Sequence, residues 1–288
     1  QSSGNISMPY GRSWMYMSNK NSLSPERIKY LKKVKRQKIA TWTIRFLILV
    51  LFFALWEIAA RLKLIDAFVT SQPSRMLRTL ENLYREGDLF RHIGVTCLET
   101  VAGFVIGTIL GTAIAVMLWW SDFAARVMEP YLVVLNSLPK VALGPIFIIW
   151  IGAGPSAIIA MALAISLIVT ILEVLNAFIH TDVEKIKLVE TFGANRLQVF
   201  TKVVFPSNIP AMINALKVNV GLSWVGVITG EFLVSKAGLG YLIVYGGQVF
   251  QLDLVMTSVI ILAIAAAIMY QGVVWIQKKL TGGQVTDK

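Results

Sequence analysis

Ionisable and polar residues inside long apolar stretches are the residues of this sequence that could bind or guide a polar solute. Lys140 directly follows Leu138-Pro139, and Lys217 lies within another long apolar run. A charged side chain at membrane depth costs about 2.5–3.5 kcal/mol on insertion scales, so each such residue needs a reason. A proline frees backbone groups, and a broken helix is tolerated where it faces a cavity. These residues therefore indicate a polar path, for which the candidates are Asn136, Pro139, Lys140, Lys217, Ser223, Trp224 and Glu231.

The two lysines have alternative roles. An ammonium group at Lys140 would attract an anion, which suits an anionic solute. The alternative is that Lys140 pairs with a buried acid or extends to the membrane surface. Lys217 has the same alternatives, with Glu173 or a backbone carbonyl as its partner.

The remaining candidates also allow a second interpretation. Glu231 either lines an outer gate beside the turn at 238–241 or serves packing alone. Ser223 and Trp224 are equally compatible with packing against lipid or the core. Glu57 and Glu99 lie near the ends of apolar stretches, so we expect them at the membrane interface.

The composition requires a membrane protein. The 288 residues are 56% hydrophobic and only 15% charged, with a mean hydropathy of +0.68. Soluble proteins carry roughly 25% charged residues. The single cysteine, Cys97, excludes an intrachain disulfide, and the sequence has no zinc signature and no phosphate-binding loop for ATP. We therefore expect no catalytic residue, metal or cofactor in this chain.

Six stretches are long and apolar enough to cross a bilayer, which takes about 20 residues in a helix. The predicted fold is thus an all-α, polytopic bundle of about six spans. The expected spans are Trp42–Leu62, Cys97–Trp120, Pro130–Ile151, Ser156–Ile179, Ile209–Glu231 and Leu254–Ile276.

Charge distribution predicts the orientation and the domain plan. Basic residues crowd positions 1–45 against one acid, Glu26, and most of the 27 Lys and Arg residues fall on segments that would then be cytoplasmic. Both termini are therefore expected inside. Residues 1–40 form a basic, partly disordered tail that meets lipid headgroups, 41–280 the membrane domain and 281–288 a second tail. No nucleic-acid-binding module accompanies the basic block.

Two shorter patterns add detail. Residues 73–84 repeat apolar side chains with a helical period, which predicts an amphipathic helix on the outer membrane face. Gly103, Gly107 and Gly111 recur every four residues. Small residues on one helix face let neighbouring helices approach closely, so these glycines predict helix packing.

The loop between the fourth and fifth spans, residues 182–206, reads as two short helices joined by a bend. Ile186, Val189 and Phe192 are expected on one face of the first helix, and Gly193 supplies the left-handed conformation that ends it. Asn195 caps a second helix, expected to end before Pro206. An exposed apolar face on this hairpin requires a partner surface.

This loop resembles the EAA loop of permeases from binding-protein-dependent ATP-binding-cassette (ABC) importers. The resemblance rests on Glu190-Thr-Phe-Gly193-Ala194 followed by Pro206. Three further motifs resemble the nitrate, sulfonate and taurine branch of that family: Thr96 through Gly111, Leu138-Pro139 through Gly154, and Gly238-Leu-Gly-Tyr241 after Glu231.

The resemblance implies a type I importer permease that works as half of a transmembrane dimer. It also implies that the chain is a transporter subunit and not an enzyme, with ATP hydrolysis in a partner subunit. The residues implied to contact the motor are Glu190, Thr191, Phe192, Gly193, Ala194 and Asn195. The implied partners are cytoplasmic ATP-binding subunits that hold ATP and Mg²⁺, a second copy of the permease, an extracellular or periplasmic solute-binding protein and the bilayer. The solute would be small and anionic or polar.

Two other classes compete with this interpretation. An ion-coupled secondary transporter usually shows inverted repeats, and we find no repeat. A channel or a membrane enzyme lacks support, because there is no selectivity-filter run or intramembrane His/Asp cluster. Copurification with a nucleotide-binding subunit separates the permease from the others.

Overall fold

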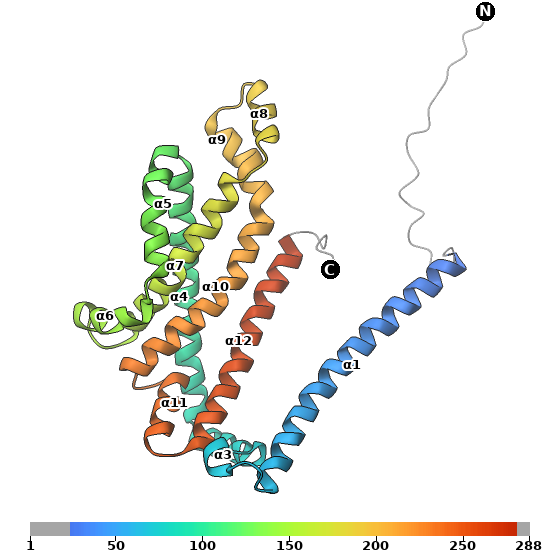
Figure 1. The fold of residues 1–288 in the computed structure, drawn as a ribbon, viewed down its shortest axis with the longest axis vertical. Helices are drawn as coiled ribbons and strands as arrows, with labels where there is room; N and C mark the ends of the chain where they lie inside the picture. Colours follow the sequence, from blue (N-terminus) through green and yellow to red (C-terminus); the bar gives the residue numbers. More distant parts are fainter. Residues whose placement is uncertain (1–23, 281–288) are drawn as a thin grey trace, which may run out of the picture. The chain divides into compact units, whose positions relative to one another are not determined.

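The computed structural model describes residues 24–280, and all of the elements within them are helices, as predicted. The expected disorder near the N-terminus and the C-terminal tail 281–288 fall outside the described residues. In chain order the elements are α1 (Pro25–Arg61), α2 (Ala67–Thr70), α3 (Pro73–Glu86), α4 (Asp88–Trp119), α5 (Asp122–Ser137), η2 (Lys140–Leu143), α6 (Gly144–Ile151), α7 (Pro155–Ile179), α8 (Val183–Thr191), α9 (Arg196–Val199), η3 (Phe200–Val204), α10 (Phe205–Val234), α11 (Leu239–Gln248) and α12 (Leu252–Leu280) (Figure 1).

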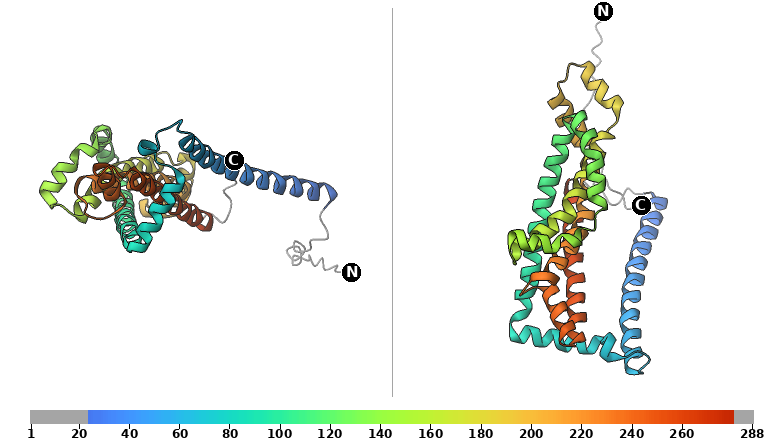
Figure 2. Two further views of the ribbon diagram at one scale, coloured as in Figure 1. Left: turned by 90° about the horizontal axis from the view of Figure 1, so that it is seen from below. Right: turned by 60° about the vertical axis from the view of Figure 1, so that its left-hand side comes forward.

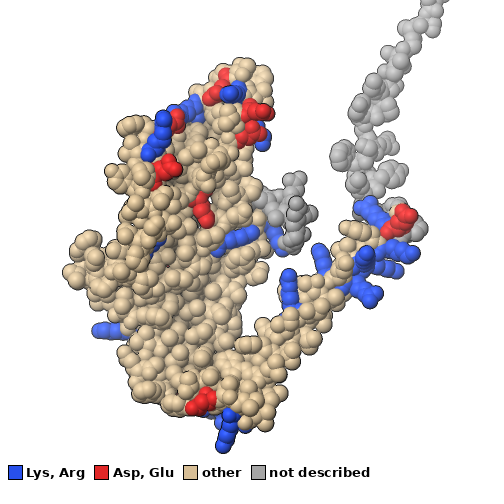
Figure 3. All heavy atoms as spheres, viewed as in Figure 1, with Lys and Arg blue, Asp and Glu red and all other residues tan. Residues whose placement is uncertain are grey.

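The chain divides into two units, residues 1–59 and 60–288. In the first unit, α1 is a single helix of 37 residues that begins at Pro25, well before the expected span at Trp42. Basic side chains gather along its first part (Figure 3). The stretch Lys29–Arg61 is long and apolar enough to cross a membrane.

Four more helical stretches of the described chain are long and apolar enough to cross a membrane: α4, α7, Arg196–Val234 and most of α12. A bent helix pair supplies a sixth, so the expected number of spans is confirmed. The third expected span, Pro130–Ile151, is not one continuous helix. It breaks after Ser137, and the two parts meet at 87°. Pro139 explains the break, because proline disfavours helical conformation in the residue before it.

Helix α7 is the centre of the second unit, packed between α4 and α10. Ala162 of α7 lies between two glycines: a Cβ built on Gly103 of α4 would stand 2.8 Å from its Cβ, and one on Gly226 of α10 would stand 2.5 Å from its Cα. Gly107 and Gly111 meet Ser166 and Thr170 of α7 at 2.7 Å in the same way. The glycine row of α4 therefore faces α7 at a distance that excludes any side chain.

The two ends of this unit differ. At one end α8 and α9 project beyond α7 and α10 (Figures 1 and 2). At the other end α3 lies across α4 and α12, with α11 beside them (Figure 2). Buried leucines join these four helices: Leu83, Leu89, Leu239, Leu242 and Leu254. The amphipathic helix predicted at 73–84 is α3, and it buries Met76 and Leu83.

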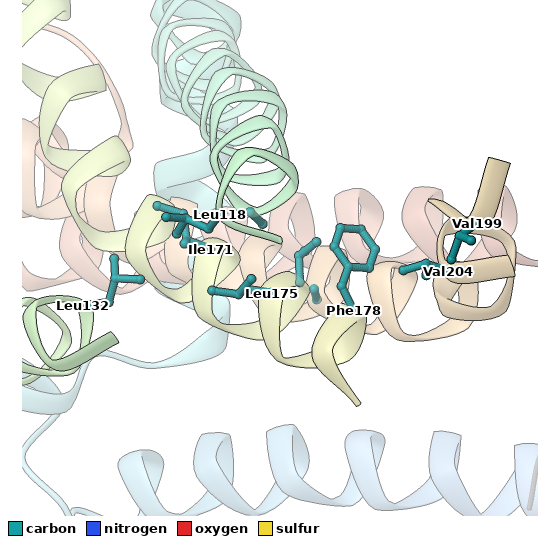
Figure 4. Packing of buried hydrophobic residues seen from close by; sticks show 10 residues of the cluster. Leu118, Leu132, Ile171, Leu175, Phe178, Val199 and Val204 are labelled. Atoms are coloured by element: carbon teal, nitrogen blue, oxygen red, sulfur yellow. The ribbon is translucent and has the colours of Figure 1, made fainter. Parts of the chain in front are cut away.

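A second apolar core lies below the projecting hairpin. Leu118 comes from α4, Ile171, Leu175 and Phe178 come from α7, and Val204 is the last residue of η3 (Figure 4). Phe178 and Val204 are 1% and 0% exposed. The hairpin therefore joins the bundle at a buried apolar cluster.

Candidate functional site

The bend of the α8–α9 hairpin is built from capping residues. Asp182 accepts a hydrogen bond from the Glu184 N–H at 3.0 Å and so caps α8. Gly193 has φ +80°, the left-handed conformation that ends a helix. Asn195 and Gln198 form a reciprocal capping box at the start of α9. The bend at Gly193 and the cap at Asn195 are therefore confirmed.

Around the bend, two of the other predicted residues bond within the hairpin. The Thr191 hydroxyl donates to the Lys187 carbonyl at 2.8 Å. The Ala194 N–H donates to the Val189 carbonyl at 3.2 Å. Glu190 is exposed near the end of α8. The bend is thus closed by the backbone itself, and the Glu190 carboxylate is left on the surface.

The second helix of the hairpin does not end before Pro206, contrary to expectation. It continues as Arg196–Val234 through a π-helical turn, in which the Phe205 N–H donates to the Phe200 carbonyl. Proline lacks the N–H that a regular helix requires. The wider turn accommodates the missing N–H of Pro206. As a result, α9, η3 and α10 form one continuous helix from the hairpin into the apolar bundle.

The base of the hairpin is anchored to the α4–α5 junction. The Arg196 guanidinium lies 3.3 Å from the Asp122 carboxylate and 5.6 Å above the Trp119 ring. Phe200 packs against the rings of Trp119, Trp120 and Phe178. The base of the hairpin therefore contacts the end of α4, the start of α5 and the end of α7.

The tip of the hairpin, by contrast, exposes apolar side chains. Phe192 is 84% exposed, and Val183, Leu188 and Leu197 are each more than half exposed. Ile186 and Val189 instead pack against the core, so the prediction that they share a face with Phe192 is wrong. Three-residue steps drift around a helix of 3.6 residues per turn, and six residues place Phe192 about 120° from Ile186.

The break after α5 holds three of the predicted path residues. The Lys140 Nζ donates to the Asn136 carbonyl at 2.8 Å and lies 3.3 Å from the Asn136 side-chain oxygen. No ion pair to an acid is found for Lys140 among residues 24–280. Pro139 and Asn136 are exposed beside it. The ammonium group therefore caps the carbonyl end of α5 at the surface of the chain.

The path candidates on α10 lie inside the packing of the chain. Ser223 and Trp224 are 0% and 5% exposed, and Trp224 packs with Val220 and Val273. Lys217 is half-buried. The structure thus separates these residues from the Asn136–Lys140 group, which lies on α5 and η2.

Glu231 occupies a different position, at the junction of α10 with α11. It is 1% exposed, and its Oε2 accepts from the Gly240 N–H at 2.6 Å. A Cβ built on Gly238 or Gly240 would stand 2.5 and 2.7 Å from this carboxylate, so only glycine fits at either position. The Gly-Leu-Gly-Tyr turn therefore packs directly against the Glu231 carboxylate and donates a hydrogen bond to it.

Two side chains of α4 complete this junction. His92 Nδ1 accepts from the Gly238 N–H at 2.9 Å, and the Thr96 hydroxyl accepts from the Leu239 N–H at 2.7 Å. The free N–H groups at the start of a helix need such acceptors. Sequence reasoning missed His92 and Thr96, although both stand at four-residue spacing on the face that continues to Gly103.

Glu99 is also buried here, at 6% exposed, so its carboxyl group lies inside the helix packing of the chain. The expected span began at Cys97, whereas α4 begins at Asp88. Glu99 therefore lies three turns inside the helix rather than at its end.

These features define a multi-span membrane protein with a capped helical hairpin at one end. Residues 103–282 match the family of binding-protein-dependent transport system inner membrane components. The chain belongs to this family and is a permease subunit of the ABC importer class.

Relatives support the same assignment. The chain is 25% identical over 260 residues to the putative aliphatic sulfonates transport permease SsuC of Bacillus subtilis, covering 90% of this chain and 94% of that protein. It is 27% identical over 199 residues to the formylaminopyrimidine transport permease ThiX of Halalkalibacterium halodurans, covering 69% and 78%.

Solved structures share the fold. A bacterial ABC transporter involved in import of the acidic polysaccharide alginate gives a TM-score of 0.61 at 13% identity, covering 88% of this chain and 99% of that one. The inward-facing MetNI methionine ABC transporter gives 0.52 at 19% identity, covering 66% and 97%.

Proposed function

We propose that this permease imports a small anionic or polar solute, driven by a separate ATP-binding subunit that contacts the α8–α9 hairpin. The observation that carries the proposal is the contrast within the hairpin: Phe192 at its tip is 84% exposed, whereas Val199 and Val204 at its base are 4% and 0% exposed. An apolar tip on an anchored base suits docking into a groove, followed by transmission of movement.

The proposed solute class rests on the relatives and on the break after α5. The matched permeases are named for aliphatic sulfonates, taurine and formylaminopyrimidine. Lys140 carries a positive charge at the break, with Asn136 beside it. A cation and an amide at a helix break suit an anionic group such as a sulfonate.

The remaining partners follow from the family. We propose a second copy of this chain as the other half of the pathway, a solute-binding protein on the outer side, and ATP with Mg²⁺ held by the ATP-binding subunits alone. The hairpin and both termini face the cytoplasm, in agreement with the basic residues at positions 27–45.

Photo-cross-linking tests the proposed docking. A photo-reactive amino acid is placed at position 192 in the tagged full-length chain, expressed in its native cells. We expect an adduct with an ATP-binding subunit, identified by mass spectrometry, because the Phe192 side chain is 84% exposed at the bend of the hairpin.

The matched control places the same group at position 77 in α3, which is 67% exposed at the opposite end. Position 77 should give no adduct with an ATP-binding subunit. Adducts with such a subunit from position 77 but not from position 192 would overturn the proposed docking.

A further inference from the structure

Two buried carboxyl groups meet where α4, α10 and α11 join. Glu99 of α4 and Glu231 of α10 are 6% and 1% exposed. Their side chains lie within hydrogen-bonding distance of each other. No lysine or arginine forms an ion pair with either among the described residues. Two neighbouring carboxylates without a cation repel each other strongly when water is excluded.

One oxygen of each carboxyl group lacks a hydrogen-bond donor within residues 24–280. Glu99 Oε2 and Glu231 Oε1 are fully buried, and neither finds a donor in the described chain. A carboxylate only accepts hydrogen bonds, whereas a protonated carboxyl also donates one. A single proton placed between these two groups turns the contact into an O–H···O⁻ hydrogen bond, which is among the strong ones in proteins.

From this geometry we infer that Glu99 and Glu231 form a proton-binding site, which holds one shared proton in the folded permease. The proton belongs on Glu99. Glu231 already accepts from the Gly240 N–H, and the Thr96 hydroxyl and Tyr241 N–H also lie within reach of it. Donors of this kind stabilise the ionised form of the group that accepts them.

Other ionisable groups lie around the junction on each of the neighbouring helices. On α4, His92 is bonded to the Gly238 N–H, and Cys97 lies near Glu231. On α11, Tyr241 stacks on His92 and on Tyr245. From α12, Asp253 pairs with Arg75, and from α7, Glu173 lines a separate pocket with Arg126. Lys217 lies four turns before Glu231 on α10.

The proton has a structural consequence. The Glu231 carboxylate holds the start of α11, and Glu99 connects that carboxylate to α4. In water a glutamate loses its proton well below neutral pH. Unfolding at neutral pH therefore releases a proton that the folded chain holds, and stability must fall as the pH rises.

Thermal unfolding of the full chain, purified in detergent with its associated subunits, tests this site. The Tm of the wild type should fall as the pH is raised from about 6 to about 9, with the folding equilibrium constant losing up to about tenfold per pH unit. Glu99→Gln should have a flatter profile, because its amide N–H donates to Glu231 at every pH. The control Glu86→Gln, an exposed residue of α3, should follow the wild type.

Infrared spectroscopy gives a readout that does not depend on the stability of a variant. The wild type should show the carbonyl stretch of a protonated carboxylic acid at neutral pH, and Glu99→Gln should lack it. Equal pH profiles for wild type and Glu99→Gln, or no protonated carboxyl band in the wild type, would refute the site. A Tm that depends on sodium or potassium concentration instead of pH would refute it as well, since the ligand would then be a metal cation.

Discussion

Single glycines decide how this permease bends and packs. Gly193 adopts φ +80° at the hairpin bend, and a Cβ added there would meet nothing within 4 Å. The constraint is therefore conformational and not steric crowding. Left-handed backbone costs a residue with a Cβ about 1–2 kcal/mol, and asparagine is among the residues that tolerate it best.

This distinction gives a matched pair of substitutions. Gly193→Val should distort the bend and lower solute uptake per ATP hydrolysed about five- to thirtyfold, following the 1–2 kcal/mol cost. Gly193→Asn should stay close to the wild type. Uptake and hydrolysis are measured together in proteoliposomes that contain the permease with its ATP-binding subunits. Equal uptake per ATP hydrolysed in both variants would show that the conformation of the bend does not matter for coupling ATP hydrolysis to transport.

Residues with strong local preferences were predictable from the sequence. Gly193 and Asn195 act within a few residues of themselves, so their roles as bend and cap followed from residue type. The burial of Glu99 was not predictable, because it depends on Glu231 and the turn at 238–240, more than 130 positions later. The sequence predicted Phe192 on the same helix face as Ile186 and Val189, because the three residues are spaced three apart. Three-residue steps do not stay on one face of a helix with 3.6 residues per turn.

At the scale of elements, close packing of α4 and α10 on α7 holds the spans together. Contacts such as that of Gly103 with Ala162 leave no room for even a methyl group. The glycine spacing on α4 predicted that a helix would pack there, but the identity of the partner helix required the structure. The break at Pro139 was likewise signalled by the proline, whereas its 87° angle was not.

Two glycines of α4 allow a controlled test of this packing. Gly103→Ala places a Cβ 2.8 Å from the Ala162 Cβ, so we expect the free energy of unfolding to fall by about 1–3 kcal/mol. Gly94→Ala, in the same helix, meets nothing within 4 Å and should be neutral or slightly stabilising. Thermal unfolding in detergent measures both. A loss of stability in Gly94→Ala equal to that in Gly103→Ala would contradict the close helix contact.

At the scale of the molecule, the described chain combines apolar spans with a projecting helical hairpin, and its sequence contains no phosphate-binding loop. The continuous helix Arg196–Val234 runs from the hairpin through the bundle and ends beside the turn that leads into α11. Six spans and the order of the motifs were visible in the sequence. The arrangement that joins the hairpin to this junction was not, because the π-turn at 200–204 had no distinct sequence signal.

We propose that a separate ATP-binding subunit drives this permease through the hairpin tip. The most direct test is to purify the tagged full-length chain in mild detergent and to measure the copurified ATP-binding subunit and its ATP hydrolysis. The wild type and the control Leu77→Asp should bring that subunit with them, whereas the double substitution Leu188→Asp and Phe192→Asp should lose it and remain folded. A folded wild-type chain that purifies without any nucleotide-binding subunit, or a double variant that retains it fully, would contradict the account.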